Sequence, residues 1–309
     1  MKKLVSTLNL SHEEWLKYRK SGIGGSDAGA ICGLNPYASP MSVYHDKTRE
    51  DTEGCDNESM RQGRDLEDYV ARRFMEATGK KVRRSNAMYQ SEDYPFMLAN
   101  VDRLVVGEQA GLECKTASAY NADKWKDDNI PSHYQIQCHH YMAVTGANAW
   151  YLAVVILGRE FKYIKIERDD AIIRDLIKIE SDFWYNHVLT RAMPEPDGSE
   201  ICDEVIKQYY PHGNQETIVL PDSFNLKLKR RETLQEMIDL LTKEQKQIEQ
   251  EIKLFMQEHE SAVGDRYQVT WSGVDSARLD TTKLKKERPE IYQSYANVSH
   301  TRRFTVKAA

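Results

Sequence analysis

The segment from Pro95 to Thr116 constrains the fold most, because charged residues interrupt its otherwise apolar runs. Two apolar runs, 97–106 and 112–114, flank a polar connection that contains Gly and Glu. Two runs separated by such a connection predict a β-hairpin. A hairpin places charged residues of both strands on a shared surface. If that surface is buried, the surrounding chain has to provide partners for those charges.

Asp102 interrupts the first run, and Glu113 and Lys115 bracket Cys114 in the second. Alternate side chains of a strand share a face, so Glu113 and Lys115 point the same way, and strand pairing can bring Asp102 beside them. Buried charges are costly unless they pair or bind metal, and two neighbouring carboxylates repel unless a cation lies between them. Oxygen ligands of this kind suit Mg²⁺ or Mn²⁺. The alternative is a surface hairpin with ordinary solvated charges.

Composition excludes several classes of protein. The 309 residues are 40% hydrophobic and 29% charged, and no apolar run approaches the roughly 20 residues of a membrane span. The first residues become polar too quickly for a secretory signal. Five scattered cysteines form no CxxC pair, which argues against a zinc ribbon or disulfide framework and fits a reducing cytosol. The net charge of −5 means that any DNA binding rests on a local basic groove.

A glycine-rich turn at 21–33 follows a predicted helix that carries Arg19 near its end. Ser26 and Asp27 are good N-caps for a short helix that stops at Gly33. Free backbone N–H groups at such a helix start can bind an anion, and the nearby Arg19 favours a phosphate pocket. The GxxxxGK[ST] pattern is absent, and a simple capped turn is the alternative. Residues 47–58 are polar and are predicted to form a loop.

The remaining polar residues of interest lie on two predicted helices. Glu67 flanks the apolar stripe of a helix over 59–78. Gln135, Gln137 and Tyr141 lie on a helix that starts near Pro131 and ends at Gly146, with Gln137 and Tyr141 on one face because they are four residues apart. Two strands are predicted next, 149–157 and 161–167, and the first is apolar enough to be a buried central strand.

The Pro-rich stretch 194–198 marks the predicted domain boundary, so residues 1–195 form one domain and 196–309 a second region. A heptad seam predicts a coiled-coil helix over about 224–258. It is interrupted by one polar member, Gln245. A helical hairpin, an oligomer contact or packing on its own domain are the alternatives. A small tail with short alternating runs follows and is basic at its end.

In order, the polar landmarks resemble those of the PD-(D/E)XK nuclease superfamily. Asn100-Val101-Asp102 stands where that superfamily shows its Pro-Asp, Glu113-Cys114-Lys115 supplies the (D/E)XK, and the Gln-x-x-x-Tyr helix is typical of the branch that includes the RecB nuclease domain. The resemblance implies a restriction-endonuclease-like α/β core, a mixed sheet flanked by helices, followed by the coiled-coil region and a small α+β tail.

A closer resemblance, over roughly residues 10–190, is to YqaJ-type viral recombinases, phage nucleases related to lambda exonuclease. It rests on the segments 19–28 (Arg-Lys-Ser-Gly-Ile-Gly-Gly-Ser-Asp-Ala), 63–67 (Gly-Arg-Asp-Leu-Glu), 99–102 (Ala-Asn-Val-Asp), 135–137 with Tyr141, and 144–146 (Val-Thr-Gly). The resemblance implies a metal-dependent deoxyribonuclease from a phage or prophage, active in the bacterial cytoplasm.

The resemblance also implies roles for residues. Asp102, Glu113 and the Cys114 backbone carbonyl would hold one Mg²⁺, or Mn²⁺, and Glu67 would help hold a second ion or orient its water. Lys115 would position or activate the attacking water. Gln137 and Tyr141 would order Lys115 or the DNA backbone. Arg19 and Ser26, seven residues apart as in lambda exonuclease-like proteins, would bind the 5′-terminal phosphate, with Gln135 as a further DNA contact.

Three functions stay open. The first is a 5′→3′ exonuclease on double-stranded DNA ends that supplies single strands to an annealing recombinase and forms a homo-oligomer, a trimer in lambda exonuclease-like proteins. The second is an endonuclease on branched or single-stranded DNA. Its iron–sulfur version needs a cysteine quartet that the spacing does not supply. The third is a non-catalytic DNA-binding module, which the intact Asp102, Glu113 and Lys115 disfavour.

Overall fold

The computed structural model describes residues 1–50 and 57–307. The chain forms two compact units, Met1–Tyr210 and Pro211–Ala309, and each is described by itself. The first unit extends beyond the expected boundary at residue 195, because helix α7 (Glu200–Tyr209) packs against α3 (Pro40–Thr48). Cys202 and Val205 of α7 are buried in the core of this unit.

A five-stranded mixed sheet lies at the centre of the first unit, in the order β2-β5-β6-β7-β8. Its strands are β2 (Val82–Arg84), β5 (Arg103–Val105), β6 (Ala110–Ala117), β7 (Ala149–Ile156) and β8 (Glu160–Glu167). Only β6 and β7 run parallel, and the other neighbours are antiparallel. A second sheet, β1-β3-β4, joins β1 (Lys2–Ser6), β3 (Ala87–Gln90) and β4 (Leu98–Asn100) in antiparallel pairs.

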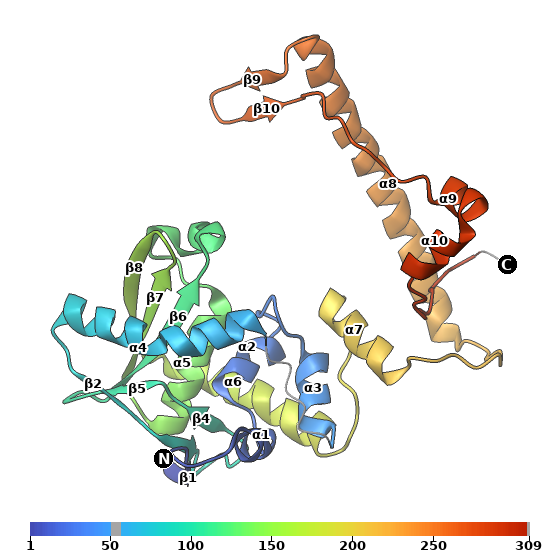
Figure 1. Ribbon diagram of the computed structural model, residues 1–309. Helices are drawn as coiled ribbons and strands as arrows, with labels where there is room; N and C mark the ends of the chain where they lie inside the picture. The colour runs from blue at the N-terminus through green and yellow to red at the C-terminus, as the bar shows by residue number, and fades with distance from the viewer. Residues whose placement is uncertain (51–56, 308–309) are drawn as a thin grey trace. The chain divides into compact units, whose positions relative to one another are not determined.

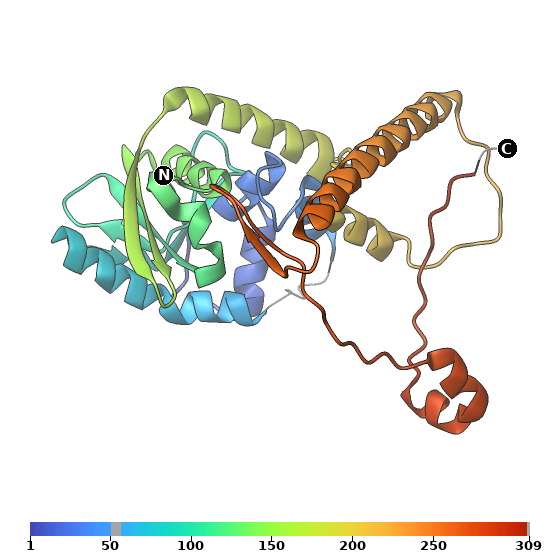
Figure 2. The ribbon, with the colours of Figure 1, turned by 90° about the horizontal axis from the view of Figure 1, so that it is seen from above.

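Helices cover both faces of the central sheet (Figures 1 and 2). Every residue of β7 is buried, as expected for a central strand. Because strand side chains alternate, Trp150 and Leu152 belong to one core with α5 (Ser132–Thr145), while Tyr151 and Ala153 belong to another with α4 (Glu58–Thr78). The remaining helical segments of this unit are α1 (His12–Lys20), α2 (Gly25–Ile31), the 3₁₀ segment Ala119–Asp128, α6 (Asp170–Phe183) and a π-helical turn, Trp184–Val188.

The predicted hairpin is present, but its first strand is divided. The apolar run 97–106 supplies β4 to the small sheet and β5 to the central sheet. Asp102 lies between the two strands, where the chain passes from one sheet to the other. The second strand is longer than predicted, because β6 continues to Ala117 alongside β7. The division puts Asp102 at a junction of sheets instead of within a regular strand.

Helix ends follow local chemistry, with two corrections. Ser11 caps α1 through a capping box with Glu14, and Gly79 and Gly146 end α4 and α5 with φ of 69° and 73°. The N-cap of α2 is Gly24, so Ser26 and Asp27 are not N-caps but lie in its first turn. The loop predicted from residue 47 begins later, because Lys47 and Thr48 complete α3 and are buried. Residues 51–56 of that loop lie outside the described residues.

Glycines allow α2 to lie directly on α5. A Cβ built on Gly25 would meet the Tyr141 ring at 2.6 Å, and one on Gly29 would meet the Cβ of His133 at 2.8 Å and its backbone at 3.1 Å. Gly25 and Gly29 are four residues apart and therefore share one face of α2. This contact brings the turn at 24–27 against the buried face of α5.

The second unit contains the long helix α8 (Asp222–Met256), the hairpin β9 (Ser261–Val263) and β10 (Gln268–Thr270), and the short helices α9 (Thr281–Glu287) and α10 (Pro289–Tyr295). α8 covers the expected heptad segment as one helix, and seam residues such as Leu241 and Phe255 are exposed. A coiled-coil partner for this seam stays a prediction. Over the ranges 1–50 and 57–307, no helix is both long and apolar enough to cross a bilayer.

Helix α6 is held to α5 and β4 by a fully buried pair. The Nδ1 of His140 lies 2.8 Å from Oε1 of Glu180, and its Nε2 lies 2.8 Å from the carbonyl oxygen of Leu98. Because that carbonyl only accepts, Nε2 carries a proton. Burial disfavours the imidazolium, but the Glu180 carboxylate and the Leu98 carbonyl outweigh it and raise the pKa of His140. Burial also raises the pKa of Glu180.

Gly29→Ala is expected to lower the free energy of unfolding by about 1–3 kcal/mol, because the new methyl group displaces the α5 backbone. Gly63→Ala on α4 is the matched control. Its Cβ would have Thr116 Oγ1 as its nearest neighbour, at 4.0 Å, so the change is expected to stabilise by about 0.5–1 kcal/mol. Urea unfolding followed by tryptophan fluorescence measures both, and equal stability of Gly29→Ala and wild type would contradict the close packing.

The His140–Glu180 pair predicts a pH dependence of stability. Both pKa values are raised on folding, so both groups bind protons more tightly in the folded state, and their contribution is present at low pH and lost as pH rises. Relative to a His140→Gln/Glu180→Gln double variant, wild-type stability is expected to be highest below the ordinary pKa of glutamate, about 4.3, and to fall as pH rises through the raised pKa values of the folded pair. Urea midpoints from acid to alkaline pH test this, and a constant difference would show that folding shifts neither pKa.

Candidate functional site

Four of the sequence-predicted residues form one buried cluster between β6 and α5. Glu113 is 4% exposed, and its Oε1 lies 2.6 Å from Nζ of Lys115 and accepts a hydrogen bond of 2.7 Å from Nε2 of Gln137. Nε2 of Gln137 also donates to the Tyr141 hydroxyl at 2.9 Å. The spacing that places Glu113 and Lys115 on one strand face, and Gln137 and Tyr141 on one helix face, therefore brings all four together.

The second oxygen of Glu113 has no partner. Its Oε2 is buried without a hydrogen-bond partner among the described residues. A buried carboxylate oxygen in this condition is costly unless a cation or a donor approaches it. The neighbouring metal-ligand candidates are carboxylate oxygens, which are the ligands that a hard divalent cation prefers.

Asp102 lies beside this cluster at the sheet junction, where its Oδ2 accepts a hydrogen bond of 2.8 Å from the backbone N–H of Cys114. Burial raises the pKa of Asp102 well above its usual value, and the nearby charges of Glu113 and Glu67 raise it further. The carboxylates are therefore close enough to repel one another, and a cation between them would remove that repulsion.

Glu67 is held by an arginine side chain. Oε1 of Glu67 pairs with Nη1 of Arg103, a buried side chain whose other amino group pairs with Asp68. Within the described part of the chain, no three His, Cys, Asp or Glu side chains form a ready metal-ligating cluster. Asp102 and Glu113 thus belong to one site, and Glu67 forms the wall of a hollow of about 260 Å³ that Asp102, Arg64 and Arg84 also line.

Lys115 keeps its positive charge because of its neighbours. Burial opposes that charge, but Glu113 and neighbouring groups more than compensate and raise the pKa of Lys115 above its usual value. Its Nζ lies 4.7 Å from the centre of the Tyr134 ring, a cation–π contact. The ammonium is therefore held between a carboxylate and an aromatic face and stays protonated near neutral pH.

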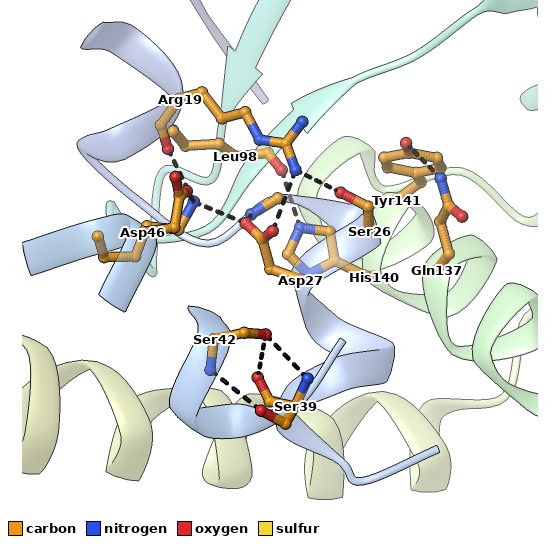
Figure 3. A network of polar contacts seen from close by, with 12 residues as sticks. Arg19, Ser26, Asp27, Ser39, Ser42, Asp46, Leu98, Gln137, His140 and Tyr141 are labelled. Atoms are coloured by element: carbon orange, nitrogen blue, oxygen red, sulfur yellow. Dashed lines mark hydrogen bonds and ion pairs between the residues drawn. The ribbon is translucent and has the colours of Figure 1, made fainter. Parts of the chain in front are cut away.

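Arg19 and Ser26, the pair that the family resemblance singled out, lie together. Nη2 of Arg19 donates to Oγ of Ser26 at 2.8 Å and contacts Oδ1 of Asp27 at 3.1 Å (Figure 3). The turn that carries Ser26 packs against Tyr141 through Gly25, so this group adjoins the Glu113 cluster. Gln135 is not part of the pocket, because its side-chain amide donates to the Ile130 carbonyl at 3.2 Å.

Sequence reasoning missed three side chains that shape this region. Arg103 binds Glu67, Asp27 binds Arg19, and Lys47 binds Asp27. Asp27 was expected to be a helix cap and Lys47 a loop residue. One sequence signal could have identified Arg103. It is a charged residue in a predicted strand, and the apolar residues Leu104 and Val105 follow it.

Comparisons with known proteins agree on the family. The YqaJ-like viral recombinase domain matches residues 14–148. The uncharacterized protein YqaJ of Bacillus subtilis (strain 168) is 40% identical over 308 residues, which cover 98% of this chain and 97% of that protein.

A solved structure shows a similar fold over 64% of the chain. LHK-Exo in complex with dAMP aligns with a TM-score of 0.51 and 19% identity, covering 64% of this chain and 98% of that chain. A second structure of LHK-Exo, described as an alkaline exonuclease from Laribacter hongkongensis, gives a TM-score of 0.49 and 18% identity over the same shares. The 40% identity with YqaJ over nearly the whole length of both chains, together with the domain match, shows that this chain belongs to the family of YqaJ-like viral recombinases.

Proposed function

We propose that this protein is a divalent-metal-dependent DNA nuclease of the PD-(D/E)XK type, acting as a 5′→3′ exonuclease on double-stranded DNA ends. The observation that carries the proposal is the arrangement at Glu113. One carboxylate oxygen is held by Lys115 and Gln137, the other is buried without a partner, and a second carboxylate, Asp102, lies beside it.

These residues fit a bound Mg²⁺ or Mn²⁺. Oε2 of Glu113, a carboxylate oxygen of Asp102 and the backbone carbonyl of Cys114 would hold the first ion, and Glu67 would serve a second ion after leaving Arg103. A bound divalent ion supplies charge neutralisation at a phosphate and lowers the pKa of a water molecule. The family and the fold likeness to LHK-Exo support the assignment.

The chain's own residues supply orientation and charge. Gln137 and Tyr141 fix the rotamer of Glu113, and Glu113 in turn fixes Lys115. The protonated ammonium of Lys115 can donate to an attacking water or to a phosphate oxygen, and it stabilises the negative charge on the phosphate oxygens in the transition state. The hollow beside Asp102 brings the charges of Arg64 and Arg84 to the same side, which suits a polyanionic substrate.

The Arg19–Ser26 pocket would hold the terminal 5′-phosphate, while the scissile bond would lie at the adjoining Glu113 cluster. A substrate anchored there is cut at a fixed distance from its end, which gives stepwise digestion. We further propose that the protein works in phage or prophage recombination in the bacterial cytoplasm, that it delivers single strands to an annealing recombinase, and that it assembles into a ring-shaped homo-oligomer. The exposed α8 seam is available for a coiled-coil contact.

Glu113→Gln is expected to lower the rate of linear-duplex digestion by at least about 100-fold, because the amide cannot replace the charge that binds a cation. Glu160→Gln on β8, which removes the exposed carboxylate paired with Lys162, is the matched control and should digest like wild type. Release of acid-soluble nucleotides with Mg²⁺, with Mn²⁺ and with EDTA gives the rates. Equal cutting of covalently closed circles would identify an endonuclease, and binding without any cutting would identify a non-catalytic module.

Arg19→Ala is expected to remove most of the preference for duplexes with a 5′-phosphate over those with a 5′-hydroxyl, because its partly exposed guanidinium is the positive charge of the proposed pocket. Lys17→Ala on the same helix is the control, since Lys17 pairs with Glu13 in solvent. Initial rates on end-defined duplexes measure the ratio of the two substrates. An unchanged ratio in Arg19→Ala would refute the pocket assignment.

A further inference from the structure

A fully buried lysine lies behind the Arg19 pocket. The side chain of Lys47, on α3, has 0% exposure, and its Nζ lies 2.7 Å from Oδ2 of Asp27. The same ammonium donates to the backbone carbonyl of Arg19 at 3.1 Å. A lysine is almost never fully buried unless its charge is matched, so this contact calls for an explanation.

Asp27 is shared between two cations. Its Oδ1 lies 3.1 Å from Nη2 of Arg19, and its Oδ2 contacts Lys47 and also accepts a hydrogen bond of 2.9 Å from the backbone N–H of Gly24 (Figure 3 shows Arg19 and Asp27). Burial alone would raise the pKa of Asp27, but Lys47 and then Arg19 outweigh it, and the pKa lies far below the usual value. Asp27 is therefore a carboxylate at any pH at which the enzyme works.

The three charges that meet at Asp27 sum to one positive charge. Arg19 and Lys47 are positive and Asp27 is negative. Next to them, Asp46 lies 3.6 Å from Arg49 and 3.8 Å from Lys47. Without Lys47 the group would be neutral, because Asp27 alone would cancel the charge of Arg19. With Lys47 present, one positive charge remains.

The exposure of each side chain decides which of these charges an anion from solvent can reach. The side chain of Arg19 is 34% exposed, while those of Asp27 and Lys47 are 8% and 0% exposed. An anion from solvent can therefore reach Arg19 and Ser26 but cannot touch Lys47. The lysine therefore acts on an incoming anion without touching it, through its contacts with Asp27 and with the Arg19 carbonyl.

We propose that Lys47 is a positioning residue for the anion pocket: it engages Asp27 from inside the protein, so that the exposed guanidinium of Arg19 keeps a full positive charge for the terminal phosphate of DNA. The contact of Lys47 with the Arg19 carbonyl fixes the end of α1, and the contact of Asp27 with Gly24 fixes the turn that carries Ser26. The inference rests on the proposed function of the Arg19 pocket, and it adds a residue that has no access to the substrate.

The test removes the charge of Lys47 and then removes its counter-charge. Lys47→Gln keeps a hydrogen-bond donor toward Asp27 but no charge, so Asp27 then cancels Arg19, and the preference for 5′-phosphate over 5′-hydroxyl duplexes is expected to fall about tenfold or more. Lys47→Gln/Asp27→Asn removes both buried charges, leaves Arg19 alone with its positive charge, and is expected to recover the preference. A merely structural lysine would not be rescued by a second substitution that removes a further ionic contact.

The preference is measured in two ways with the full chain: as the ratio of initial digestion rates in Mg²⁺, and as the ratio of equilibrium affinities in EDTA by fluorescence anisotropy. Lys80→Met, which breaks the partly exposed ion pair with Glu108, is the matched control and should keep the wild-type ratio. A wild-type ratio in Lys47→Gln overturns the inference and leaves the pocket itself standing. Failure of the double variant to recover, with an unfolding midpoint like that of wild type, also overturns it.

Two further outcomes also test the inference. If wild type shows no preference for 5′-phosphate, the proposed pocket and this inference fall together, whereas the nuclease assignment is judged separately by digestion in Mg²⁺. If Lys47→Gln does not fold, Asp27→Asn replaces it. Removing the competing negative charge is expected to maintain or increase the preference, and a lost preference would show that Asp27 orients Arg19 sterically, which contradicts the charge argument.

Discussion

The parallel pairing of β6 with β7 is the contact on which the candidate site depends. β7 is buried along its whole length, so it can neither slip nor turn without exposing one of the two cores, and β6 is registered against it over eight consecutive residue pairs. That register fixes Glu113 and Lys115 on the face covered by α5 and leaves Cys114 on the opposite face. A shift by one residue would place the glutamate and the lysine in the core beneath α4.

The second constraint is the close approach of α2 to α5. The glycines at 25 and 29 have no side chains, so Tyr141 and His133 of α5 occupy the space next to α2 and the two helices lie close together. The contact joins the basic turn at Arg19 and Ser26 to the helix that carries Gln137. An anion pocket and a carboxylate cluster that lie far apart in sequence thereby become neighbours, and the distance between them is set by two packed helices.

Charge matching in the interior ties these constraints together. His140 and Glu180 hold α6 to α5 and β4, Asp27 and Lys47 hold α2 to α3, and Arg103 holds the sheet junction to α4. Each pair is costly to bury and is tolerated because both partners arrive together. Among the described residues, Oε2 of Glu113 and Oε2 of Glu180 are both buried without a hydrogen-bond partner. Glu113 differs from Glu180 because a second carboxylate, Asp102, lies beside it and accepts a hydrogen bond from the neighbouring Cys114 N–H. That second carboxylate is what distinguishes a candidate cation site from the structural ion pairs around it.

The sequence by itself determined the elements and the local geometry of the site. The caps at Ser11, Gly79 and Gly146 follow from local chemistry, because serine caps a helix start and glycine tolerates a positive φ at its end. The buried strand after Ala149 follows from its continuous apolar run. The shared face of Glu113 and Lys115, and that of Gln137 and Tyr141, follow from spacing, since strands and helices repeat at fixed periods. The tertiary structure alone decided that Asp102 lies at a junction of two sheets, that Glu67 turns to Arg103, and that Lys47 reaches Asp27 from another helix. Those contacts join residues far apart in the chain, and their partners are chosen by which buried charges need neutralising once the helices are packed, which no local pattern encodes.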